Sequence, residues 1–78
     1  MNTNLLKARM YEYGLNDRSM SNILGINTAT FYRKKNGTSD FLRREIQVMR
    51  ETLHLSPEDV DAIFFGQELA EMQVQELQ

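Results

Sequence analysis

Apolar residues recur along the chain at helical rather than strand spacing. The most regular run places four of them three or four residues apart: Leu42, Ile46, Met49 and Leu53. This spacing puts side chains on one face of an α-helix. Residues 4–13 and 17–24 carry shorter versions of the same pattern, and no segment alternates with a period of two. The pattern therefore predicts an all-α fold.

Glycines and capping residues mark where the predicted helices begin and end. Each of the four glycines follows a stretch with helical apolar spacing, where a residue without Cβ suits the left-handed end of a helix: Gly14, Gly25, Gly37 and Gly66. Asn16, Asn27 and Ser56 stand where each can cap a following helix. In the segment SPED, Pro57 takes the first helical position and Asp59 can close a capping box. Five helices are expected, the fourth from about residue 42.

The second and third predicted helices are short and joined by a glycine turn, which is the outline of a helix-turn-helix. Met20 and Leu24 would pack the first of the pair against Ile26 and Phe31 of the second. With Phe31 facing the core, four residues of the third helix face outward: Thr28, Ala29, Tyr32 and Arg33. A helix that presents its N-terminal residues in this way fits the major groove of DNA.

The chemistry of these outward residues suits base edges. Arg33 can donate two hydrogen bonds to a guanine, and Thr28 can donate or accept one. The methyl group of Ala29 or the ring of Tyr32 can meet a thymine methyl. We therefore interpret this face as a DNA-reading surface.

Charge is distributed unevenly along the 78 residues, which form one small domain. Residues 1–50 carry all nine Lys and Arg against four acids, a charge of +5, whereas residues 51–78 carry seven acids and no base. This asymmetry indicates a basic working face with an acidic back or tail. The net charge of −2 is unusual for a protein that binds nucleic acid.

These residues resemble the lambda-repressor-like, or Cro-type (XRE-like), helix-turn-helix regulators of phages and bacteria. The resemblance covers GLNDRSMSNILGINTATFYRKKNG, residues 14–37, closely, and extends over FLRREIQVMRETLHLSPEDVDAIFF to about residue 65. The chain looks most like the short phage-associated members that end in a helix of the SPEDVDAIFF type. The resemblance implies a compact five-helix bundle whose third helix reads operator DNA, usually as a dimer.

Site residues follow from the outward face and from the resemblance. The base-reading candidates are Thr28, Ala29, Tyr32, Arg33 and Asp17. The phosphate-binding candidates are Asn16, Asn27, Lys34, Lys35, Asn36, Arg43 and Arg44. Position 17 commonly holds Gln in the family, so that Asp17 would repel phosphates unless it meets a cytosine amine or caps its helix. Lys34 and Lys35 replace the one apolar residue usual in this turn, which leaves Phe31 to anchor the helix nearly alone.

The basic residues also have simpler interpretations. A run such as RKK is often only a solvated surface. Arg43 and Arg44 lie in the first turn of the fourth helix, where the helix dipole disfavours cations by about 0.3–1 kcal/mol. A bound phosphate would explain them, and so would ion pairs with Asp40 or Glu45.

No residue set supports enzyme chemistry, a cofactor or a metal. The chain has no cysteine and one histidine, His54, and we find no paired nucleophile and base. The acidic run at Glu58, Asp59 and Asp61 is better explained by the dipole of the fifth helix than by a metal. No apolar run approaches the roughly 18 residues that a membrane span needs. We therefore expect a non-enzymatic protein in the cytoplasm of a bacterial host cell.

We divide the chain into a DNA-binding domain, residues 1–66, and an acidic C-terminal tail, residues 67–78. The tail is either frayed or part of a homodimer contact formed by Phe65, Leu69 and Met72. The expected partner is a palindromic double-stranded operator bound by a phage or prophage repressor. The alternative is an antirepressor-like protein-interaction module that binds another phage regulator, which Asp17, the negative net charge and an outward Ile23 favour.

Overall fold

The structure is a computed structural model that describes residues 2–65, and every regular element in this range is a helix. The elements are α1 (Thr3–Glu12), α2 (Asp17–Leu24), α3 (Thr28–Lys35), α4 (Arg43–Thr52), α5 (Pro57–Val60) and the π-helix η1 (Asp61–Phe65). Helix α5 runs directly into η1. The predicted all-α class is confirmed for these residues, whereas the predicted tail, with Leu69 and Met72, lies outside them.

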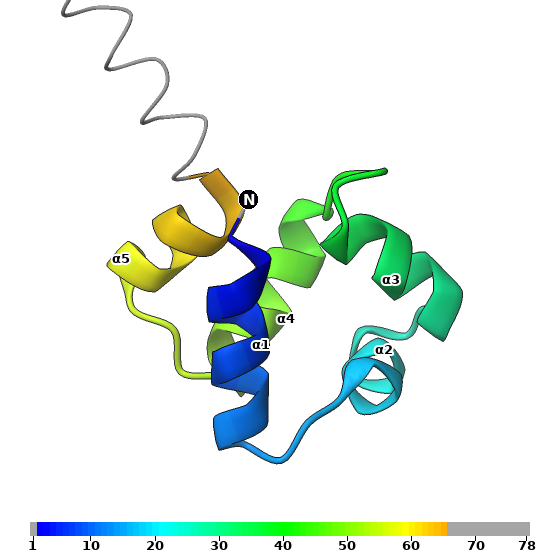
Figure 1. The fold of residues 1–78 in the computed structure, drawn as a ribbon, viewed down its shortest axis with the longest axis horizontal. Helices are drawn as coiled ribbons and strands as arrows, with labels where there is room; N and C mark the ends of the chain where they lie inside the picture. The colour runs from blue at the N-terminus through cyan, green and yellow to red at the C-terminus, as the bar shows by residue number, and fades with distance from the viewer. Residues whose placement is uncertain (1, 66–78) are drawn as a thin grey trace, which may run out of the picture.

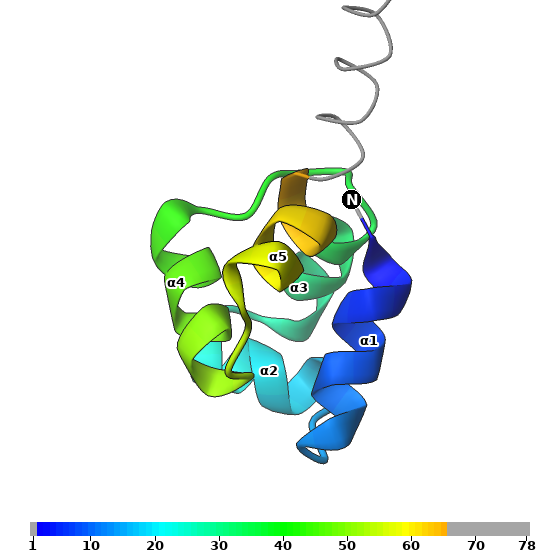
Figure 2. The same ribbon diagram turned by 90° about the vertical axis from the view of Figure 1, so that its left-hand side faces the viewer.

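The helices surround one apolar core. Helices α1 and α4 lie in the middle, with α2 and α3 on one side and α5 on the other (Figure 1), and the view from the α5 side places α5 in front of α3 (Figure 2). The buried core residues come from α1 to α4, η1 and the α4–α5 connection: Leu6, Met10, Met20, Leu24, Phe31, Met49, Leu53, Leu55 and Ile63. Since so small a domain has one core, each helix depends on its neighbours for burial.

The helix boundaries predicted from capping residues are confirmed. The side chains of Asn16, Asn27 and Ser56 each accept a hydrogen bond from the N–H three residues further on, at 2.9–3.0 Å. Asp59 closes the predicted capping box by accepting the Ser56 N–H at 3.3 Å. Gly25 ends α2 with a φ of 73°, in the left-handed region that glycine adopts without a Cβ clash.

The fourth helix begins one residue later than its apolar spacing predicts. Met49 and Leu53 are buried and Ile46 is partly buried, but Leu42 is 57% exposed and precedes the helix as its N-cap. Its backbone N–H donates to the Glu45 carboxylate at 2.8 Å. The expectation that Leu42 belongs to the buried stripe is therefore wrong, because residue 42 has extended rather than helical backbone.

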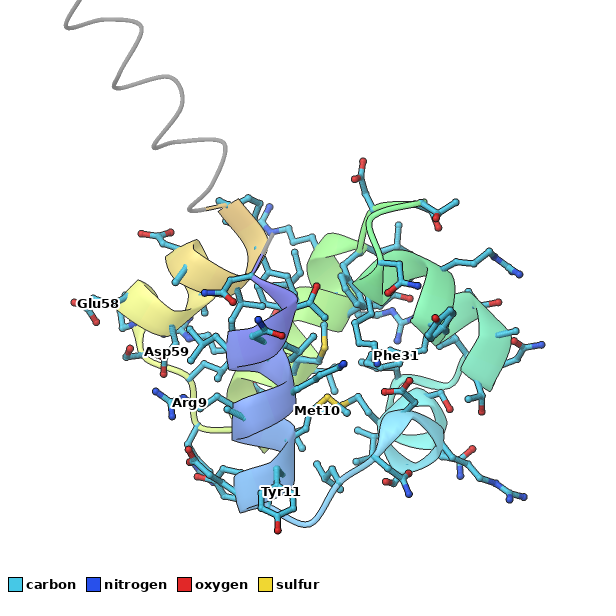
Figure 3. All side chains as sticks on the ribbon, in the orientation of Figure 1. Arg9, Met10, Tyr11, Phe31, Glu58 and Asp59 are labelled. Atoms are coloured by element: carbon cyan, nitrogen blue, oxygen red, sulfur yellow. The ribbon has the colours of Figure 1, made fainter. Side chains whose placement is uncertain are left out.

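The two ends of the domain are tied together. The Asn2 N–H donates to the Ile63 carbonyl at 3.0 Å. The Arg9 guanidinium donates to Asp59 at 3.3 and 3.4 Å and to Glu12 at 2.7 Å, and Figure 3 shows Arg9 facing Asp59 while Glu58 points away. The hydrogen bonds to Asp59 and Glu12 raise the pKa of Arg9, and those from Arg9 and Ser56 lower the pKa of Asp59. Asp59 thus links α5 to α1 in addition to capping its own helix.

Candidate nucleic-acid interface

Helices α2 and α3 are joined by three residues and packed through their inner faces. Met20 and Leu24 of α2 and Phe31 of α3 are all buried, as the apolar pattern predicts. Ser21 is also fully buried, and its hydroxyl lies 3.1 Å from the Thr28 hydroxyl at the start of α3. The first turn of α3 is therefore held against α2 by a polar contact as well as by the core.

The outer face of α3 carries the predicted base-reading residues. Thr28, Ala29, Tyr32 and Arg33 are all exposed, which confirms their predicted outward orientation. The Arg33 guanidinium donates to the Thr30 hydroxyl at 3.3 Å and pairs with no carboxylate within residues 2–65. Most of its donors consequently remain available to a ligand, and the base-reading role stays a prediction.

Lys34 and Lys35 point inward. The prediction that their side chains are exposed and bind phosphate is therefore wrong. Both residues are buried, with 9% and 5% exposure. The Lys34 ammonium donates to Glu45 at 2.8 Å and to the Asp40 carbonyl at 3.2 Å. Positions 34 and 35 lie three and four residues after Phe31, so the helical repeat places them on its inner side. Neither ammonium group belongs to the exposed surface.

Asp17 is the partner of Lys35. Both carboxylate oxygens accept from the Lys35 ammonium at 2.8 Å, and the Asp17 side chain is 31% exposed. Lys35 also lies 5.5 Å from the centre of the Tyr32 ring. Asp17 was expected to face DNA as an unbalanced negative charge or as a base reader. The ion pair offsets that charge and commits both oxygens to Lys35.

Glu45 is a buried carboxylate whose Oε1 atom accepts two hydrogen bonds. It is 1% exposed and accepts from Lys34 and from the Leu42 N–H, each at 2.8 Å. Burial raises the pKa of Glu45, but the hydrogen bonds from Lys34 and Leu42 and the charges of Lys34 and Arg44 outweigh it, so that the pKa lies below its ordinary value. Glu45 is therefore ionised and connects α3 to the first turn of α4.

Arg43 and Arg44 extend from that first turn into solvent. Both are exposed, and neither forms an ion pair with Asp40, with Glu45 or with any other carboxylate of the part that the structure describes. The ion-pair alternative for these two arginines is therefore not realised. Their charges stand where backbone N–H groups also favour an anion.

The asparagines of the candidate site have donors available. The side-chain oxygens of Asn16 and Asn27 are committed to capping α2 and α3, while their amide NH2 groups donate to no atom of residues 2–65. Asn36 is the exposed C-cap of α3. All three residues are thus placed at helix ends with an amide donor that could reach a phosphate oxygen.

Arg18 is a candidate that the sequence interpretation overlooked. It is the second residue of α2, is exposed, and pairs with no acid in the described range. The sequence feature that identifies Arg18 is the same as for Arg43 and Arg44. Each is a cation in the first turn of a helix, where the helix dipole disfavours positive charge. Arg18 therefore joins the phosphate-binding candidates.

Phe65, the described member of the predicted dimer contact, is 43% exposed. It borders a groove shared with the α3–α4 connection, α4 and η1, whose walls include Lys34, Asp40, Phe41 and Phe64.

Within residues 2–65, no helix is long and apolar enough to cross a membrane, and no group of His, Asp and Glu is arranged to hold a metal ion.

The chain matches no protein-family model, no curated protein and no solved structure.

Proposed function

We propose that this protein is a sequence-specific DNA-binding regulator with a lambda-repressor-like helix-turn-helix, formed by α2 and α3. The outer face of α3 reads base edges in the major groove, with Arg33 as the principal base-reading residue. The observation that carries this proposal is the exposed outer face of α3, whose arginine has no acidic partner within residues 2–65. An arginine in this position matches the commonest specific contact to guanine.

The cations around α3 support the same proposal. Because Glu45 binds Lys34, the first turn of α4 adjoins the last turn of α3, and Arg43 and Arg44 extend from it. Arg18 extends from the first turn of α2. Three arginines thus stand at helix starts next to the reading helix, where they would contact phosphates on either side of the groove and fix its orientation.

We further propose that the regulator is a phage or prophage repressor that acts as a homodimer in the bacterial cytoplasm, with Phe65 in the dimer contact. Two copies would read half-sites about 34 Å apart, one helical turn of DNA, which compensates for the modest affinity of one small module.

Selection of bound duplexes from a random-sequence pool, at moderate salt and with non-specific competitor, tests this function. Enrichment of a palindrome with half-sites one turn apart is expected. Arg33→Ala should then weaken the selected duplex about 5- to 150-fold, corresponding to about 1–3 kcal/mol, and relax the preference at one base pair. Arg43→Ala should weaken all duplexes alike and reduce the salt slope by about 1.

Arg50→Ala is the matched control, because Arg50 is exposed and forms no ion pair in the described range but lies beside Pro57 and Val60 on the far side of the domain. It should leave both duplex preference and salt slope unchanged. Failure to enrich any motif would refute the proposed function.

One observation favours a second candidate, an antirepressor-like module that binds a partner regulator. Ile23 is 44% exposed on α2, where an apolar side chain contributes nothing to phosphate binding. Asp17 no longer favours this alternative, because Lys35 pairs with its carboxylate. The selection experiment distinguishes the two candidates, since a protein-binding module would enrich no DNA motif.

A further inference from the structure

Side-chain bonds hold α3 at both of its ends. At the start of the helix, the Thr28 hydroxyl meets the buried Ser21 hydroxyl of α2 at 3.1 Å. At the end, Lys35 binds Asp17, the first residue of α2, with two contacts of 2.8 Å. Lys34 binds Glu45 of α4 at 2.8 Å. The helix is therefore attached by its side chains to α2 and α4, in addition to the apolar anchor Phe31. A third neighbour, α1, forms a hydrogen bond with the backbone of α3, where the Thr3 hydroxyl donates to the Lys35 carbonyl at 3.1 Å.

The two lysines are adjacent in sequence but act in different directions. Successive residues of a helix differ by about 100° around its axis. Lys35 is consequently aimed at α2 while Lys34 is aimed at α4. A contact in one direction still allows the helix to roll, whereas contacts in two directions fix its rotation about its own axis.

The rotation of α3 matters because it decides where the outer side chains lie. The surface of a helix with its side chains is about 5–6 Å from the axis, so that a roll of about 10° moves a side-chain tip by about 1 Å. A bidentate hydrogen bond tolerates less than this, since its donor–acceptor distances span only about 2.7–3.2 Å, a range of about 0.5 Å. Lys35 also lies beside the Tyr32 ring on the reading face.

From these contacts we infer that Lys34 and Lys35 are positioning residues, whose ion pairs with Glu45 and Asp17 fix the rotation of α3 and thereby set the base preference of its outer face. The inference rests on the proposed function. Buried ion pairs commonly add little stability compared with apolar residues of the same size, but their hydrogen bonds are directional. The run RKK thus combines one reading residue, Arg33, with two residues that orient it.

The test compares Lys35→Met with the control Lys7→Met, a lysine of α1 that is exposed and has no acidic partner within the described range. Methionine keeps most of the apolar stem of Lys35. Each variant is titrated with the selected duplex and with a scrambled duplex of equal length at two salt concentrations, and thermal unfolding verifies that it is folded.

Lys35→Met should weaken binding of the selected duplex roughly 5- to 20-fold more than binding of the scrambled duplex, a difference within the range of one base contact. The uncovered charge of Asp17 repels both duplexes alike and does not contribute to this difference. The salt slope of Lys35→Met should be unchanged, and Lys7→Met should keep the wild-type preference. If Lys35 instead contacted a phosphate, both duplexes would weaken equally and the salt slope would fall by about 1. That result, or an unchanged preference, would overturn the inference.

Should Lys35→Met fail to fold, Asp17→Asn breaks the same ion pair at its more exposed partner. This substitution removes the negative charge with little change in side-chain shape, and the same loss of base preference is expected. A wild-type protein that selects no motif would refute the proposed function and, with it, this inference. A wild-type protein that selects a motif which both variants retain would refute the inference alone.

Discussion

Removing the cation beside Glu45 provides the sharpest test of the packing between α3 and α4. In the wild-type protein Glu45 is 1% exposed and accepts hydrogen bonds from the Leu42 N–H and the Lys34 ammonium, each at 2.8 Å. Lys34→Met removes the ammonium and leaves the backbone N–H as the donor. Breaking a buried ion pair by removing one partner costs about 3–5 kcal/mol. A domain of 78 residues has a total free energy of unfolding of about 4–12 kcal/mol, so that the loss is a large share of it.

The effect should depend on pH in a defined direction. In the wild-type protein the pKa of Glu45 is lowered below its ordinary value of 4.5, so its contribution to stability is present above that value and is lost as the pH falls through the lower, folded-state pKa. Without Lys34, we expect burial to outweigh the Leu42 hydrogen bond and the charge of Arg44 and to raise the pKa of Glu45. The variant is then destabilised as the pH rises through that raised pKa, and the gap to wild type widens from pH 4 to pH 7.

Urea unfolding followed by far-ultraviolet circular dichroism at several pH values between 4 and 8 measures this gap. The matched control is the double variant Lys34→Met/Glu45→Gln, in which the amide oxygen still accepts the Leu42 N–H but no charge is buried. It should recover most of the loss at pH 7. A loss below about 1 kcal/mol at pH 7, or a gap that does not vary with pH, would refute the reasoning.

Two further predictions concern α5. Ser56→Ala removes the side-chain acceptor for the Asp59 N–H, and should lower the free energy of unfolding by about 1 kcal/mol in the same urea assay, whereas Ser56→Asp, which retains an acceptor, should not. Asp59→Asn should reduce the acid sensitivity of unfolding, because Arg9 lowers the pKa of Asp59 in the folded protein. The contribution of Asp59 to the free energy of unfolding is therefore present above the ordinary carboxyl pKa of 3.8 and is lost as the pH falls through the folded-state value. Thermal unfolding between pH 2 and 6 measures this, and an identical pH profile for the variant would contradict the pairing of Arg9 with Asp59.

The features that the sequence predicted correctly depend on neighbouring residues. Asn16, Asn27 and Ser56 cap helices through bonds to residues three positions away, and Gly25 ends a helix through its own backbone. The inward orientation of Phe31 follows from its spacing along α3. Such features are legible in a single sequence because the interacting groups are close along the chain.

The features that it missed depend on residues distant in sequence. The partners of Lys34 and Lys35 are 11 and 18 residues away, and no local pattern pairs them. The helical repeat places both lysines beside Phe31, but their charge favoured an exposed surface. For the candidate site, the outward orientation of Arg33 could be predicted, whereas the ion pair that occupies Asp17 could not.

The burial of two lysines also determines how the domain responds to amine chemistry. Lysine occurs only at positions 7, 34 and 35 of the chain. Since Lys34 and Lys35 are held in ion pairs at 9% and 5% exposure, Lys7 is the one lysine side chain that the described fold leaves open to acylation. The exposed cations next to α3 are all arginines, which acetylation does not neutralise. Lysine acetylation of the folded protein would therefore leave the charge of its proposed DNA-binding surface intact.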